Sequence, residues 1–170
     1  MCMAVPELEK MITEEIVDVP PMPSYAHGEI IIALGAALYP HVRAYRLGHV
    51  YAAHTTYHID GMPDRLPDLT FIAPNTAPST VHRDSEVAPD LVVEIVSATD
   101  TYGTVSAKVQ EYLDHGVRLV WVINPWLHTI DAYEAARQRL FALNDVLDAE
   151  PVIPGFTLPM RDLFDWEFNP

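Results

Sequence analysis

The chain has 170 residues, 49% hydrophobic and 20% charged, a balance typical of a folded globular protein rather than a disordered one. Its 24 acidic and 10 basic residues give a formal charge of −14, which argues against binding nucleic acid through a basic surface. The length fits one domain, so we expect residues 1–170 to form a single unit.

The sequence gives no sign of a membrane segment. No uninterrupted apolar stretch approaches the ~20 residues needed to cross a bilayer. The first residues lack a basic segment followed by an apolar one, so we also expect no secretory signal. The single cysteine, Cys2, cannot form an internal disulfide and fits a reducing cytoplasm.

The first third of the chain predicts mainly helix. Residues 7–19 favour a short helix that becomes extended before the prolines of residues 20–23. Ser24 can cap a longer helix that ends before Gly48, with Pro40 expected to kink it or shorten its last turn. Its apolar stripe has helical spacing and comprises Ile30, Ile31, Leu34, Leu38 and Val42.

The middle of the chain predicts two strands joined by a turn. Residues 50–59 are β-branched and aromatic, which favours a strand, and a turn follows at residues 61–64. A second apolar run covers residues 69–73, directly after Pro67 and Asp68. Residues 74–89 are rich in Pro, Ser and Thr and are expected to form a loop.

The second half predicts a strand–helix–strand unit followed by a hairpin. Apolar strands over residues 91–96 and 119–123 flank a helix over about 104–115, which Gly116 closes. This crossover should be parallel and right-handed, with the second strand central in the sheet. Residues 129–133 and 139–143 predict the hairpin, and residues 152–166 an irregular proline-rich tail with an apolar anchor at Leu163 and Phe164. The order of elements implies an α/β fold of the α+β kind, with a mixed sheet flanked by helices.

Two acids and a lysine are the strongest candidates for chemistry. Glu94 interrupts the apolar run of residues 91–96, where an unpaired charge would cost several kcal/mol. Asp68 heads the preceding strand, and Lys108 follows on the predicted helix. Two strand-borne carboxylates and a lysine can hold a divalent metal and activate a water molecule. In the alternative, Asp68 caps a turn, Glu94 pairs with an arginine and Lys108 is solvated.

Burial and the neighbouring charge of Asp68 should raise the pKa of Glu94 in the metal-free protein.

Other chemistries have less support. His54 and His58 would lie ~13 Å apart on one strand, too far to share a zinc ion. No Gly-x-Ser-x-Gly sequence occurs, which disfavours serine-triad catalysis. Trp121 and Tyr133 are expected in the core, and His27 is either a packing or capping residue or a residue at the edge of the site.

The pattern of these residues resembles a known family. Its most specific part spans residues 90–125, and weaker parts lie at Pro23-Ser24, at His27 and at residues 152–158. The matching positions between 67 and 125 are Pro67-Asp68, Val93-Glu94-Ile95-Val96-Ser97, Asp100, Lys108, Tyr112, His115-Gly116-Val117 and Val120-Trp121-Val122-Ile123-Asn124-Pro125. Together they resemble the Uma-type restriction-endonuclease family, a branch of the PD-(D/E)XK nuclease superfamily, over roughly residues 15–165.

The resemblance implies a restriction-endonuclease-like fold with its core at about 15–165 and Asp68 and Glu94 as metal ligands. The superfamily's lysine position is occupied here by Val96, so the resemblance implies that Lys108 reaches back from the helix, with Tyr112 on the same face. Glu15 would match an N-terminal acid that often joins such a site. The segment between the first helix and the proline-containing strand departs from the family pattern, which puts the role of Glu15 in doubt.

The resulting hypothesis is a metal-dependent endonuclease that hydrolyses phosphodiester bonds in nucleic acid, with DNA as the expected substrate. Asp68, Glu94 and the backbone carbonyl of Ile95 would bind Mg²⁺ or Mn²⁺, and Lys108 would position the attacking water. We also expect a homodimer, because enzymes that cut both strands of a duplex commonly use two-fold symmetry. The alternative, which the acidic charge favours, is a catalytically inactive protein of this fold that acts as a dimeric binding or regulatory module.

Overall fold

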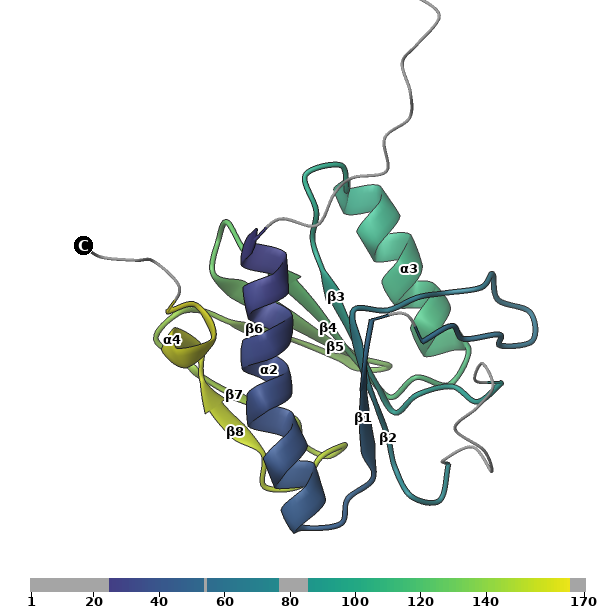
Figure 1. The fold of residues 1–170 in the computed structure, drawn as a ribbon. Coiled ribbons are helices and arrows are strands. Elements are labelled where there is room, and N and C mark those ends of the chain that lie inside the picture. The colour runs from purple at the N-terminus through teal and green to yellow at the C-terminus, as the bar shows by residue number, and fades with distance from the viewer. Residues whose placement is uncertain (1–24, 54, 77–85, 166–170) are drawn as a thin grey trace, which may run out of the picture.

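A computed structural model describes residues 25–53, 55–76 and 86–165. One mixed sheet has the strand order β1-β2-β3-β4-β5-β6 (Figure 1), which confirms the predicted α/β architecture. Its strands are β1 (His49–Ala52), β2 (Leu69–Ile72), β3 (Leu91–Ile95), β4 (Leu119–Asn124), β5 (Thr129–Glu134) and β6 (Arg137–Phe141).

Neighbouring strands of this sheet are antiparallel, except that β3 and β4 run parallel as predicted. Helix α3 (Tyr102–Asp114) connects those two strands, and helix α2 (Tyr25–Ala44) precedes the sheet in the chain. A second, two-stranded sheet pairs β7 (Val146–Asp148) with β8 (Thr157–Pro159), and the short helix α4 (Met160–Leu163) follows it.

The central strands are buried on both faces because each face is covered by a helix. Alternate residues of β3 point to opposite sides, as the pleat requires. Leu91, Val93 and Ile95 share one core with the inner face of α2, while Val92 shares another with Val109 of α3. Continuous apolar runs are typical of strands covered in this way, which is why strands could be predicted at residues 91–96, where β3 ends at Ile95, and at residues 119–123.

Helix α2 has the predicted apolar stripe. Ile30, Leu34, Leu38 and Val42 are buried, whereas Ile31 is only partly buried. The helix continues through Pro40 to Ala44 rather than ending there. The proposed cap at Ser24 and the helix predicted for residues 7–19 lie outside the described residues.

Two predictions about strands were wrong. The strand expected over residues 50–59 ends at Ala52, whose ladder partner is Leu69, the first residue of β2. Between Ala52 and β2, the strand pairing that the described residues make is an isolated bridge between Tyr57 and Arg65. The tail expected to be irregular instead contributes β8 to the second sheet, although Leu163 and Phe164 are buried as predicted.

None of the helices in the described part of the chain is long and apolar enough to cross a membrane.

Candidate active site

The register of β2 and β3 brings the two candidate acids together. Leu69 is paired with Val93, and the backbone N–H of Asp68 donates to the Val93 carbonyl at 3.1 Å. One further step of the antiparallel register places Asp68 opposite Glu94. The site therefore lies where β2 begins and β3 ends.

Asp68 is held from two directions. Its Oδ2 accepts a hydrogen bond from the backbone N–H of Ile95 at 2.7 Å. Its Oδ1 lies 2.9 Å from Nε2 of His27, in the first turns of α2. His27 therefore lies at the edge of the site, one of the two roles considered for it. Only 16% of the His27 side chain and 18% of the Asp68 side chain are exposed.

Glu94 is held by two side chains of α3. Tyr112 donates its hydroxyl proton to Oε1 at 2.6 Å, and Nζ of Lys108 donates to Oε2 at 3.2 Å. The two donors stand four residues apart, which places them on one face of the helix. The alternative prediction of an arginine partner for Glu94 and a solvated Lys108 is wrong, because these two residues pair with each other.

Burial governs the protonation of this cluster. Loss of hydration raises the pKa of Glu94, as predicted, and the charge of Asp68 raises it further. Lys108 and the hydroxyl of Tyr112 oppose this effect without cancelling it. Burial and the adjacent Glu94 also raise the pKa of Tyr112, so its hydroxyl remains a donor. The hydrogen bond to Asp68 raises the pKa of His27 despite its partial burial.

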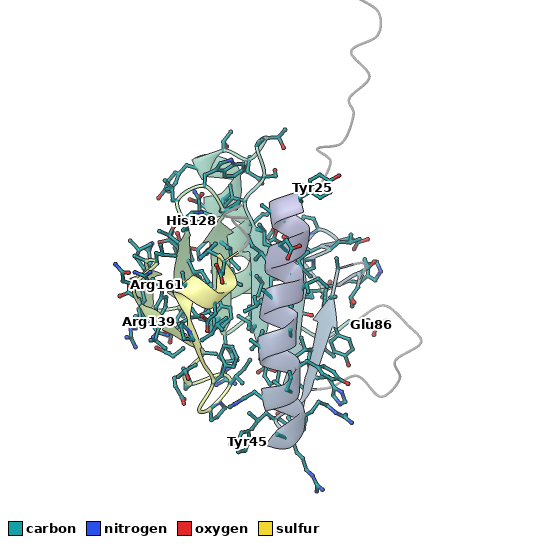
Figure 2. All side chains as sticks on the ribbon, turned by 60° about the vertical axis from the view of Figure 1, so that its left-hand side comes forward. Tyr25, Tyr45, Glu86, His128, Arg139 and Arg161 are labelled. Atoms are coloured by element: carbon teal, nitrogen blue, oxygen red, sulfur yellow. The ribbon has the colours of Figure 1, made fainter. Side chains whose placement is uncertain are left out.

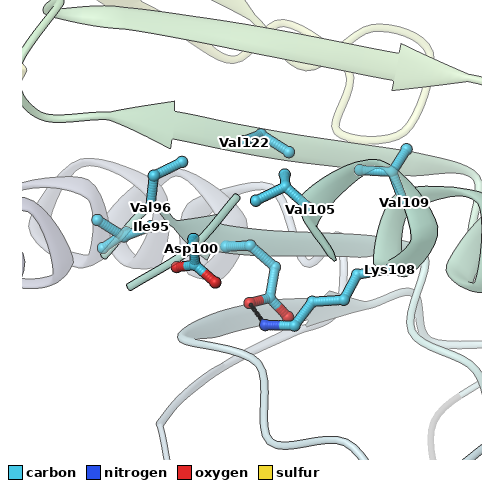
Figure 3. Close-up of a pocket in the computed structure, with 8 residues that line it drawn as sticks. Ile95, Val96, Asp100, Val105, Lys108, Val109 and Val122 are labelled. Atoms are coloured by element: carbon cyan, nitrogen blue, oxygen red, sulfur yellow. Dashed lines mark hydrogen bonds and ion pairs between the residues drawn. The ribbon is translucent and has the colours of Figure 1, made fainter. Parts of the chain in front are cut away.

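A small pocket adjoins Glu94 and Lys108 (Figure 3). Its walls are mainly apolar, with valines from β4 and α3, and Asp100 adds a second carboxylate opposite Lys108. Oδ2 of Asp100 accepts from both the backbone N–H and the hydroxyl of Ser97, at 2.8 and 2.7 Å. Burial alone would raise the pKa of Asp100, but the Ser97 hydrogen bonds and the charge of Lys108 lower it.

Asp100 lines the pocket, but the sequence analysis named it only as a position that matches the family and gave it no role at the site. The sequence Ser-x-x-Asp between a strand and a helix could have signalled it, because these side chains often hydrogen-bond to a local turn. Another missed contact is the ion pair between Arg65 and Glu111, whose Nε–Oε2 distance is 2.9 Å. It ties α3 to the segment before β2, and no local sequence pattern predicts a partner 46 residues away.

The structure does not establish a role at the site for the other residues that the sequence analysis considered. Glu15 and His54 lie outside the described residues, and the role of the Ile95 carbonyl stays a prediction. Nδ1 of His58 lies 2.7 Å from Oδ1 of Asp64. Within the described residues no group of three or more His, Cys, Asp or Glu side chains is arranged to hold a metal.

The donor set nevertheless fits one kind of ion. Magnesium is commonly bound through one or two protein carboxylates while it keeps several water ligands. Asp68 and Glu94 supply two such carboxylates, and an oxygen that accepts one hydrogen bond retains a second lone pair. The raised pKa of Glu94 marks a buried acid whose charge a cation would compensate.

Comparison with known proteins gives two similarities. The model of the Uma2 family, described as "Putative restriction endonuclease", matches residues 6–161. A crystal structure described as a putative nuclease belonging to DUF820, from Anabaena variabilis, superposes with a TM-score of 0.74. The two chains are 21% identical over 86% of this chain and 84% of that one, a likeness that shows a shared fold. No curated protein matches the sequence.

Proposed function

The chain belongs to the Uma2 family, and on that premise we propose that it is a Mg²⁺-dependent endonuclease that hydrolyses phosphodiester bonds in nucleic acid. The observation that carries the proposal is the place of Asp68 next to Glu94, one register step beyond the Leu69–Val93 pair, with Nζ of Lys108 3.2 Å from Oε2 of Glu94. Two hard oxygen donors and a cation are the elements that such hydrolysis requires.

Each side chain of the site has a distinct role in this proposal. Asp68 and Glu94 hold Mg²⁺, or Mn²⁺ in its place, together with the carbonyl of Ile95. The bound cation supplies Lewis-acid stabilisation of the charge that develops on the phosphoryl oxygens. Lys108 orients the attacking water, while Tyr112 and His27 keep the two carboxylates in position through the hydrogen bonds described above.

DNA is the proposed substrate, and the protein would act in the cytoplasm as a homodimer. The formal charge of −14 opposes any long contact with phosphates, so we expect weak binding when no divalent cation is present. Affinity should then depend on the cation more steeply than in a nuclease with a basic groove.

A cleavage screen tests this proposal. Single- and double-stranded DNA and RNA are incubated with the protein and either Mg²⁺ or Mn²⁺, and products are resolved on denaturing gels. Wild type should cleave at least one substrate only when a divalent cation is present, and Glu94→Ala should not. Asp114→Asn is the matched control, because Asp114 is an exposed acid on α3 whose side chain bonds Gln110 rather than the site.

The competing proposal is a protein that keeps this fold without catalysis and acts as a dimeric binding or regulatory module. The strongly acidic composition favours it. If wild type cleaves none of the four substrates with either cation, and neither cation changes its thermal stability, the endonuclease proposal fails and this one remains.

A further inference from the structure

The outer face of α2 carries few charges for an exposed helix surface. This outer face comprises the exposed residues Tyr25, Gly28, Glu29, Ile32, Ala36, Tyr39 and Arg43. Figure 2 shows α2 in the foreground between the labelled Tyr25 and Tyr45, with no other helix or strand in front of it. Solvent-facing helix surfaces are normally polar, yet Ile32 is 70% and Tyr39 is 54% exposed.

Helix α3 provides the comparison within the same molecule. Its exposed positions are Tyr102, Gly103, Thr104, Ala107, Gln110 and Asp114, and the large apolar side chain among them, Tyr102, lies at the first residue of the helix rather than along its face. In α2, Glu29 and Arg43 are the only formally charged residues in twenty. An apolar surface of this kind is typical of a helix that packs against a partner.

The two charges of α2 are arranged symmetrically. Glu29 and Arg43 lie seven residues before and seven residues after Ala36, the small residue at the middle of the outer face. Fourteen residues of helix span about 21 Å. Within the described residues, neither charged side chain forms an ion pair or hydrogen bond.

We infer that a second copy of this chain docks on the outer face of α2, with the two helices antiparallel about a two-fold axis at Ala36. This arrangement brings Glu29 beside Arg43 of the partner subunit, and two-fold symmetry repeats the pair at the other end. A parallel arrangement would instead place each charge beside its own copy. The arrangement is therefore self-complementary only in the antiparallel orientation.

Side-chain sizes suit the same geometry. The small Ala36 at the axis allows the helices to approach closely, within the 8–10 Å usual for packed helices. Ile32 then lies beside Tyr39 and Pro40 of the partner subunit, so the two large apolar side chains of the outer face that lie nearest the axis are covered in each copy. One helix face is smaller than the roughly 800 Å² per partner of a standard interface, so we expect a reversible dimer with a micromolar dissociation constant.

Charge reversal tests the inference through sedimentation velocity over about 1–500 µM protein. Wild type should dimerise with increasing concentration. Glu29→Arg and Arg43→Glu should each weaken the dimer about tenfold or more, because each places like charges at both ends of the interface. The double variant Glu29→Arg/Arg43→Glu should restore the wild-type dissociation constant to within about threefold, because opposite charges face each other again.

Two further variants complete the design. Ala36→Glu places two carboxylates at the axis and should abolish the dimer, whereas Asp114→Arg on the exposed face of α3 should leave it unchanged. Circular dichroism checks that each variant is folded. A wild type that is monomeric at every concentration overturns the inference and leaves the face to residues 1–24 or to another protein. Single reversals without effect, or a double variant that does not recover, overturn it equally.

This inference does not depend on phosphodiester hydrolysis. The variants alter neither Asp68, Glu94 nor Lys108, and His27 is not part of the outer face. A monomeric protein that cleaves nucleic acid would refute the dimer alone, and an inactive dimer would refute the endonuclease alone.

Discussion

Lys108 is the only lysine in the described part of the chain, and a third of its side chain is exposed. Its stem extends along the apolar valines of the pocket while the ammonium group reaches Glu94, as long basic side chains often do. An ammonium group placed in this way can orient a water molecule beside a metal-bound phosphate without itself binding the metal.

Replacing Lys108 by alanine should therefore separate catalysis from metal binding. We expect Lys108→Ala to lower the rate of Mn²⁺-dependent cleavage by roughly 10²-fold or more with little change in metal affinity. Single-turnover cleavage and calorimetric titration of Mn²⁺ measure the two quantities. Gln110→Ala, two residues further along α3, is the control, and full activity in Lys108→Ala would remove the lysine from the mechanism.

The raised pKa of Glu94 has a consequence for metal-free stability. An acid whose pKa is higher in the folded than in the unfolded protein favours unfolding once the pH exceeds the unfolded value. The loss begins as the pH rises through the ordinary glutamate range and is complete above the folded-state pKa. Glu94→Gln should therefore raise the melting temperature at pH 8 relative to wild type, with a smaller gain at pH 4.

Thermal melts of wild type and Glu94→Gln at the two pH values, in the presence of a chelator, measure this difference. Asp114→Asn serves as the comparison for loss of an exposed charge. An equal effect of Glu94→Gln at pH 4 and pH 8 would show that burial does not control the ionisation of this acid.

At the scale of elements, the position of α3 determines whether Lys108 and Tyr112 reach Glu94. The helix begins with a capping box in which the side chains of Thr101 and Thr104 bond each other's backbone N–H groups. Downstream, the Arg65–Glu111 ion pair ties the helix to the segment before β2. These contacts fix the helix at two points on either side of Lys108.

Loss of the cap should destabilise the protein without abolishing the fold. Replacing a capping threonine by alanine typically costs ~1 kcal/mol. For a chain of this size, that cost corresponds to a fall in melting temperature of roughly 2–4 °C for Thr101→Ala. Differential scanning calorimetry measures it, with the exposed Thr99→Ala as the control. An unchanged melting temperature would mean that the cap contributes nothing to the position of α3.

Much of the sheet could be predicted because its buried strands carry continuous apolar runs. The end of β1 could not be predicted, because composition favours a strand up to residue 59. The strand ends at Ala52 because its ladder partner, Leu69, is the first residue of β2. Strand β8 was missed because Pro151 and Pro154 dominate the local sequence, whereas its pairing with β7 depends on tertiary packing.

The candidate site shows the same division. The residues alone suggested that Asp68, Glu94 and Lys108 form one site. The resemblance to the family implied that Lys108 reaches back from the helix, with Tyr112 on the same face. The hydrogen bond from the Ile95 backbone N–H to Asp68 could not be predicted, because it depends on the register of β2 and β3, which the sequence alone does not define. The Arg65–Glu111 ion pair could not be predicted either, because it depends on the path of the loop that carries Arg65, and a loop has no repeating sequence pattern.

For the whole molecule, the excess of acids makes divalent cations the expected source of added stability. A ligand present at 100 times its dissociation constant stabilises the folded state by about 2.7 kcal/mol. We therefore expect saturating Mn²⁺ to raise the melting temperature of wild type by roughly 5–10 °C.

The variant Asp68→Ala should lose this gain, whereas Asp114→Asn should keep it. Scanning fluorimetry with Mn²⁺, and with equal ionic strength supplied by NaCl, distinguishes specific binding from general screening of the negative surface. A gain that is the same in NaCl, or that persists in Asp68→Ala, would place the cation elsewhere on the molecule.

The hydrogen bonds of Asp68 make one of its carboxylate oxygens a substitute for a main-chain acceptor, since Oδ2 receives the Ile95 N–H that would otherwise need a carbonyl. An asparagine at this position could fill the same place, with its oxygen accepting from Ile95 and its amide group donating to His27. Asp68→Asn, which exchanges one oxygen for nitrogen, would therefore remove the negative charge and keep the hydrogen bonds that hold residue 68 in the fold. A descendant of this chain that carries Asp68→Asn would keep its sheet intact and lose the proposed metal ligand.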